Sequence, residues 1–161
     1  MPTLGLRCGA ALLLALSMGC SGDGAPSDAA RQEQLEATFE PAFQQVSEQY
    51  RASMAEVQGQ GRTALESQDR QKVLDVYRAL GDAAAESAKR FSALTPPARV
   101  EQQFKDLVAN LEAQRTALDS VVAAAKAEQD GPLTEGLGEF SELLVEFGTI
   151  QESINTALAD E

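Results

Sequence analysis

The chain has 161 residues, with 13 Lys and Arg against 25 Asp and Glu, a formal net charge of -12, and neither His nor Trp. Sequence-independent affinity for nucleic acid comes from Lys and Arg that neutralise phosphates, so this acidic balance excludes a nucleic-acid partner. Haem with a His ligand, His-containing zinc sites and Ser/His or Cys/His nucleophile pairs all require imidazole, so enzymes of those types are excluded too. A chain of this length is expected to form one domain.

Residues 1–20 have the layout of a signal peptide. Arg7 precedes an apolar run from Cys8 to Met18, and the small residue Gly19 follows before Cys20. The run has about a dozen residues, whereas a helix needs roughly 20 to span a bilayer, so we expect no permanent transmembrane helix here. Two alternatives are a plain secretory signal, in which the thiol of Cys20 is incidental, and a helix buried in the core.

The segment Leu16-Ser17-Met18-Gly19-Cys20 resembles the lipobox of bacterial lipoproteins, whose last residue is the acylated cysteine. That family has a large aliphatic residue three places before the cysteine, where this chain has Ser17. The resemblance implies removal of residues 1–19 and attachment of a diacylglycerol and a further acyl chain to Cys20. Each buried methylene contributes about 0.8 kcal/mol and stable anchoring takes more than one chain, so these lipids are expected to hold the protein on a membrane.

The residues directly after Cys20 predict a destination and a tether. Lipoproteins that carry Ser after the cysteine, as Ser21 does here, are commonly sent to the outer membrane, so the resemblance implies the periplasmic face of that membrane. Secretion and inner-membrane anchoring are the alternatives.

The residues of the stretch 21–28 are small and polar, with Gly and Pro and no apolar period, so we expect residues 20–28 to form a lipid-bearing flexible tether.

From residue 29 to residue 161, apolar residues recur every three or four positions, which is the period of helices packed nearly parallel. Four helical segments carry such a stripe: one over about 29–60, one over about 68–94, one that starts at Pro96 and has its last stripe residue at Ala125, and one whose stripe runs from Leu133 to Leu158. The connections between them are short, so neighbouring helices are expected to be antiparallel. The predicted fold class is all-α, an antiparallel up-down-up-down four-helix bundle over residues 29–161. The last three segments, of about 27 to 32 residues, predict a rod about 40 to 48 Å long.

Helix-breaking residues interrupt the first segment. Pro41 lacks a backbone donor and clashes with the preceding turn, so it predicts a kink or a break near 37–41. Gly59 and Gly61 predict the end of the helix. A further glycine, Gly81, has several alanines around it and predicts a thin waist in the second helix, which either a close helix approach or a cleft would explain.

Capping and turn residues predict the other boundaries. Ser67 is the predicted cap of the second helix, and Thr95 caps the third, with Pro96 and Pro97 in its first turn. The segment Asp130-Gly131-Pro132 predicts the turn before the fourth helix.

The stripes hold all eight aromatic residues and two glutamines. We interpret the aromatics as core residues, with the wall of an apolar ligand pocket as the alternative. Gln114 and Gln151 occupy stripe positions where Leu would pack better. A buried amide must find hydrogen-bond partners. Each glutamine is therefore predicted either to set the helix register, to reach solvent at a seam, or to contact a small ligand inside the bundle.

No residue pattern predicts a reactive centre. Ferritin-like carboxylate sites need Glu-x-x-His motifs and inward-facing acids, but no acid lies on a stripe here. The lysines also lie off the stripes, and no nucleophile has a base beside it. Acids and bases instead pair along exposed faces at a spacing of four residues. The pairs are Glu66 with Arg70, Glu86 with Arg90, and Glu101 with Lys105. We expect no catalytic residue, metal or cofactor; weak divalent-cation binding to the surplus acid is the alternative to a solvated acidic face.

Together these patterns predict a lipid-anchored, non-enzymatic envelope lipoprotein that acts as an interaction or structural module at the periplasmic face of the membrane. The segment Ala93-Leu94-Thr95-Pro96-Pro97 resembles a hinge that recurs in helical-bundle lipoproteins and secreted proteins of bacteria. The expected partners are the membrane, through acyl chains on Cys20, and an unidentified protein at the acidic outer faces. The alternative is a small-molecule-binding carrier or sensor that uses the bundle interior near Gln114 and Gln151.

Overall fold

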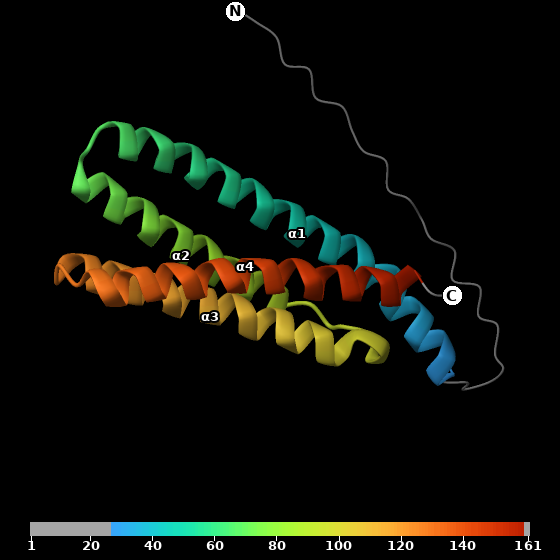
Figure 1. The fold of residues 1–161 in the computed structure, drawn as a ribbon. Coiled ribbons are helices and arrows are strands. Elements are labelled where there is room, and N and C mark those ends of the chain that lie inside the picture. The colour runs from blue at the N-terminus through green and yellow to red at the C-terminus, as the bar shows by residue number, and fades with distance from the viewer. Residues whose placement is uncertain (1–26, 160–161) are drawn as a thin grey trace, which may run out of the picture.

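The computed structural model describes residues 27–159, which form four α-helices and one short 3-10 helix and include no strand. The elements are α1 (Asp28–Glu66), α2 (Arg70–Ser92), η1 (Ala98–Val100), α3 (Glu101–Lys126) and α4 (Asp130–Ala159) (Figure 1). The predicted all-α class is therefore confirmed over this part of the chain. No helix within residues 27–159 combines the length and the apolar composition needed to cross a bilayer. The predicted signal peptide and the lipidation site at Cys20 lie outside the described residues.

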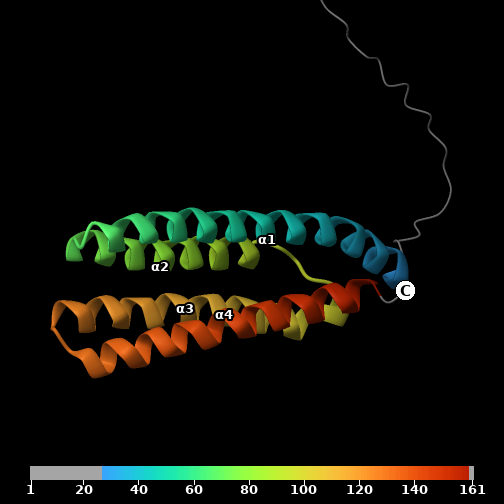
Figure 2. The ribbon, with the colours of Figure 1, turned by 45° about the horizontal axis from the view of Figure 1, so that its top comes forward.

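Each helix packs against the next one along the chain: α1 against α2, α2 against α3, and α3 against α4. Figure 2 shows α1 and α2 as one layer and α3 and α4 as a second layer beneath it. The short turns at 67–69 and 127–129 lie at one end of the molecule, which we call the far end. The start of α1, the connection 93–97 and the end of α4 lie at the opposite, near end (Figure 1).

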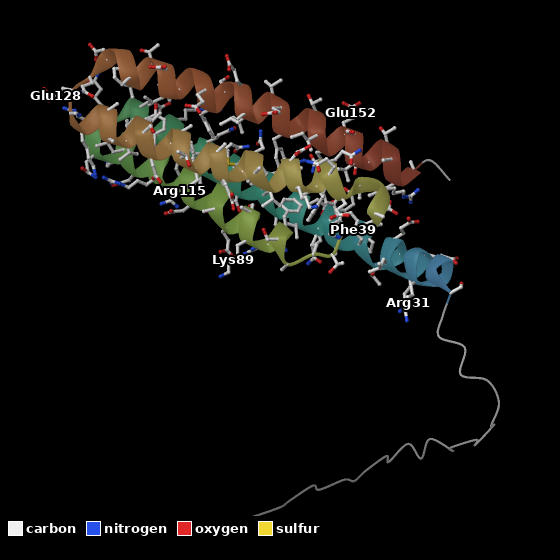
Figure 3. All side chains as sticks on the ribbon, turned by 90° about the horizontal axis from the view of Figure 1, so that it is seen from below. Arg31, Phe39, Lys89, Arg115, Glu128 and Glu152 are labelled. Carbon is white, nitrogen blue, oxygen red and sulfur yellow. The ribbon has the colours of Figure 1, made fainter. Side chains whose placement is uncertain are left out.

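The apolar stripes face the interior and pack as a core. Seven of the eight aromatic residues are buried, and Tyr77 is half-buried. Four phenylalanines from α1, α2 and α3 form a cluster with ring centroids 5.4 to 6.5 Å apart. Its members are Phe39, Phe43, Phe91 and Phe104. One of these ring pairs, Phe39 with Phe43, is stacked and the others are edge-on or tilted, and such pairs contribute about 0.5 to 1.5 kcal/mol each beyond their buried area. In Figure 3, Phe39 points toward the other helices from α1.

Small residues bring α2, α3 and α4 close together. A Cβ atom placed on Gly81 of α2 would lie 3.1 Å from the Cδ of Arg115 in α3. On Gly136 of α4, a Cβ would lie 2.9 Å from the Cγ2 of Val121 in α3. The thin waist predicted at Gly81 is therefore a close helix approach and not a cleft. Fully buried Ala84 continues the same face of α2.

The predictions for the ends of the first helix were partly wrong. The helix α1 continues through Pro41 without a break and extends past Gly59 and Gly61 to Glu66. Figure 2 shows its N-terminal part curving toward the second layer. Each interior glycine costs about 1 kcal/mol, but Val57 and Ala64 are buried on either side of this pair, and packing of that face outweighs the local cost. At 39 residues, α1 is about 58 Å long.

Three other predicted boundaries were also wrong. The side chain of Asp69, not that of Ser67, caps α2 by accepting hydrogen bonds from the next turn. Pro97 lies before η1 with an extended backbone, so the two prolines precede the helix instead of forming its first turn. The segment 130–132 belongs to the first turn of α4, and the chain reverses at 127–129, where Glu128 has a φ of 58°. Proline is tolerated in a first turn because its missing N–H has no helical partner there.

Two glycines of α4 provide a matched test of this packing. We expect Gly148→Ala to raise the free energy of unfolding by about 1 kcal/mol, because Gly148 is exposed, helical, and would have no heavy atom within 4 Å of an added Cβ. We expect Gly136→Ala to lower it, because the stiff, fully buried Val121 would have to move. Urea unfolding of both variants provides the measurement. An equal gain in stability for both would contradict the close contact between α3 and α4.

Candidate interaction site

Gln114 lies at the centre of a buried hydrogen-bond chain that joins three helices. The hydroxyl of Tyr50 in α1 donates to Oε1 of Gln114 at 2.6 Å, and Nε2 of Gln114 donates to Oδ1 of Asn110 at 2.8 Å. Asn110 in turn donates to the carbonyl of Leu143 at 3.1 Å and to a carboxylate oxygen of Glu146 at 2.9 Å. Gln114 is completely buried. Because both ends of its amide are occupied by the protein, Gln114 fixes the register of α3 against α1.

Gln151 belongs to a different hydrogen-bond group, between α1 and α4. Its Oε1 accepts from Arg51 at 2.6 Å, and one turn away Gln44 donates to Asn155 at 2.9 Å. The Nε2 of Gln151 and the hydroxyl of Ser47 are buried without a hydrogen-bond partner among the described residues. Long polar side chains therefore bridge α1 and α4, and two buried polar groups in this seam are unsatisfied.

The structure thus separates the two glutamines that the sequence singled out. The side-chain amide of Gln114 is fully hydrogen-bonded within the chain from Tyr50 to Glu146. Gln151 instead lies in the contact between α1 and α4, which is open to solvent at the exposed side chain of Arg51. Asn110 was not predicted, although it precedes Gln114 by one helical turn, because it lies beside the apolar stripe and not on it. The unsatisfied hydroxyl of Ser47 was not predicted either, since the sequence pattern does not specify which helix covers that residue.

Two adjoining hollows open at the far end, and both are lined mainly by apolar side chains, with Arg62, Arg70 and Glu128 among the charged residues at their margins. One, of about 350 Å³, lies between α1 and α2, and its lining includes Leu65, Val76 and Leu80. The other, of about 340 Å³, lies between α2 and the α3–α4 turn, and its lining includes Leu133. Both hollows share Val73 and Tyr77, so we treat them as one feature, the far-end groove. Leu65 is 67% exposed, so the described part of the chain leaves this large apolar side chain uncovered.

A third hollow, of about 610 Å³, lies at the near end between the end of α2 and the start of α3, with Phe104 and Val108 in its lining. Its lining also includes Glu101 and Lys105, which pair with each other at 2.6 Å. The pKa of Glu101 is lowered by its hydrogen bond from Lys105. This ion pair and the Glu86–Arg90 pair occur as predicted.

The predicted pair between Glu66 and Arg70 is wrong. Because α1 ends at Glu66 and the chain reverses before α2, Arg70 reaches across to the other turn of the far end. It contacts Glu128 at 2.7 Å and also donates to the carbonyl of Ala125. The pKa of Glu128 is lowered by the hydrogen bond and the charge of Arg70. One guanidinium therefore ties α2 to the turn that carries the left-handed residue Glu128 (Figure 3).

Charge is unevenly distributed over the helices. The helix α4 has six acidic residues and no Lys or Arg, in a chain whose net charge is -12. The six acids are Asp130, Glu135, Glu139, Glu142, Glu146 and Glu152. Within residues 27–159, no group of three or more His, Cys, Asp or Glu side chains is arranged to hold a metal ion.

No protein-family model matches the chain, and neither does any curated protein or solved structure. An assignment of function therefore depends on the chemistry of the chain's own residues.

The two hydrogen-bond groups predict opposite effects of mutation. We expect Gln114→Leu to lower the free energy of unfolding by roughly 2 to 4 kcal/mol, because it leaves the Tyr50 hydroxyl and the side-chain Oδ1 of Asn110 buried without partners. We expect Ser47→Ala to raise it by about 1 kcal/mol, because it removes a buried hydroxyl that has no partner. Urea unfolding measures both. A loss of stability in Ser47→Ala would show that its hydroxyl is hydrogen-bonded after all.

The burial of the Tyr50 phenol predicts that the folded protein loses stability in alkaline solution. Burial raises its pKa to about 12, from an ordinary value near 10 in the unfolded chain. Between these values the unfolded chain releases this proton and the folded protein keeps it, so stability present below pH 10 is lost as the pH rises to about 12. We expect wild type to lose on the order of 2 to 3 kcal/mol more than Tyr50→Phe over this window. Identical pH profiles from chemical unfolding of the two proteins would contradict the burial of this phenol.

Proposed function

We propose that this protein is a lipid-anchored, non-enzymatic module that holds a protein-binding surface away from the periplasmic face of the outer membrane. In this proposal its four helices act as an antiparallel up-down-up-down bundle, with acyl chains on Cys20 as the anchor and the residues from 20 to the start of α1 at Asp28 as the tether. The observation that carries the proposal is the separation of two features. The chain enters α1 at the near end, whereas the apolar far-end groove opens at the other end of a helix about 58 Å long.

The chemistry of the near end is consistent with an attachment point. Arg99 of η1 donates to Glu36 of α1 at 3.1 Å and to the backbone carbonyl of Leu158 in α4 at 3.2 Å. These bonds connect the start of α1 to the end of α4, so a load on the tether reaches two helices at once. Figure 3 places Arg31, near the start of α1, opposite Glu128 at the far end.

The charge of the molecule supports a protein partner over a lipid surface. With a net charge of -12, the chain is repelled by anionic headgroups, so an acyl anchor and not the helices themselves would supply the membrane affinity. The apolar groove, which includes a 67% exposed Leu65, is the kind of surface that a second protein covers.

The two cysteines provide a matched test of the anchor. In a bacterium with two membranes that is supplied with labelled palmitate, we expect wild type and Cys8→Ala to incorporate the label and Cys20→Ala to lose it almost completely. The physical reason is that the lipid bond requires the sulfur of residue 20, while Cys8 leaves with the signal. Intact mass of the extracted wild-type product checks the attachment. An unmodified Cys20, or equal labelling of the two variants, would refute the anchor.

A further inference from the structure

The edge of α4 that meets α1 is covered in only one half of the molecule. Residues a heptad apart share one edge of a helix, and Asn155, Gly148, Ser141 and Thr134 form such a series. At the near end, Asn155 accepts a hydrogen bond from Gln44 of α1. Toward the far end, the same edge is exposed at all three remaining positions. Figure 2 shows why, because the N-terminal half of α4 diverges from α1.

The uncovered half of this edge has the residue pattern of a helix contact. Gly138 and Val145 interleave with the series, so the positions recur every three or four residues. Val145 is 72% exposed, and a Cβ on Gly138 or Gly148 would have no heavy atom within 4 Å. Beside this edge, Leu133, Leu137 and Leu144 are only half-buried. Between Asp130 and Glu152 no residue of the edge is charged, so an uncharged surface of small side chains and Val145 continues along α4 from the far-end groove at Leu133.

The negative charge on the outer side of this edge of α4 indicates what kind of molecule binds to the edge. Glu135, Glu142 and Glu146 follow at spacings of seven and four on the outer flank of α4, away from α1. Glu146 marks this side, because it accepts from Asn110 of α3. The helix has no base to neutralise these carboxylates. A second copy of this chain packed here in a symmetric pair would place its own glutamates against them, which disfavours self-association.

We infer that the open side between α1 and α4 binds an amphipathic helix of a partner protein as a fifth helix. Large apolar side chains of the partner fill the space over Gly138 and Val145 and cover the far-end groove at Tyr77. Its Lys or Arg residues lie along the flank that holds Glu135 and Glu142. This is the helix-in-groove mode of recognition, in which apolar anchors supply affinity and flanking charges select the partner. The position of this surface relative to the membrane rests on the proposed function. The apolar and charged side chains that would bind the partner helix do not depend on it.

The probe is a synthetic amphipathic helix of leucine and lysine, labelled with a fluorophore, and the comparator is the same helix with glutamate in place of lysine. The full acylated chain is held in phosphatidylcholine nanodiscs, and empty nanodiscs provide the blank. Fluorescence anisotropy is expected to show binding of the lysine helix that weakens as salt increases, and binding of the glutamate helix at least about tenfold weaker. The mass of the same sample reports acylation of Cys20, so failure of the anchor and failure of the docking surface are observed separately.

Matched variants distinguish the docking surface from general effects. We expect Gly138→Gln to weaken binding at least about tenfold without loss of fold stability, since its Cβ meets open space. Gly59→Gln, the same change in open space on α1, is expected to leave affinity within about twofold. Glu135→Gln with Glu142→Gln is expected to reduce both affinity and its salt dependence more than Glu48→Gln with Glu56→Gln, which removes the same charge from α1.

Three results would overturn the inference. The first is equal binding of the lysine and glutamate helices. The second is an equal effect of Gly138→Gln and Gly59→Gln on affinity. The third is a dimer of the chain itself, detected by sedimentation, that Gly138→Gln dissociates, because a second copy would then be the occupant of this side.

Discussion

The sizes of the residues at the helix contacts determine the shape of this molecule. Gly81 and Gly136 let α2, α3 and α4 approach until an added Cβ would touch the neighbouring helix. No such residue pair draws α1 toward α4, and the side chains that join them, Arg51 and Gln44, are long. Close packing between α2 and α3 and between α3 and α4, together with bridging by long side chains between α1 and α4, leaves the α1–α4 side open toward the far end. Interiors pack at crystal-like density, so this difference in size becomes a difference in helix separation.

The buried polar groups of the bundle form two sets that differ in how completely they are hydrogen-bonded. The hydrogen-bond chain that runs from Tyr50 of α1 through Gln114 to Asn110 of α3 satisfies every buried amide it contains. In the bridged seam, Ser47 retains a buried hydroxyl without a partner among the described residues. Satisfied networks fix one arrangement, whereas unsatisfied groups reduce the free energy by which a contact is held. The contact between α1 and α4 is therefore the one that loses the least free energy when another helix competes for it.

The helical class and the core residues could be predicted from the sequence because the three-and-four spacing of apolar residues reports directly on burial. The helix ends could not, since Gly59 and Pro41 are local signals that tertiary packing of a long apolar face overrides. The buried role of Gln114 was within reach, because it interrupts an apolar stripe. The open edge of α4 was not. Its residues are small and uncharged, and only the divergence of α1 shows that nothing covers them.

Within residues 27–159 the connection 93–97 is the single covalent link between the two layers, and it runs at the near end with Pro97 in an extended conformation. Each layer is a complete helical hairpin whose own turn lies at the opposite end. A cut in this connection would therefore divide the protein into two hairpins without severing a helix. Their reassociation would be driven by the contacts between the layers, which include the α2–α3 packing, the Phe39–Phe104 ring pair and the Tyr50–Gln114 hydrogen bond, so the chain is a natural candidate for fragment complementation.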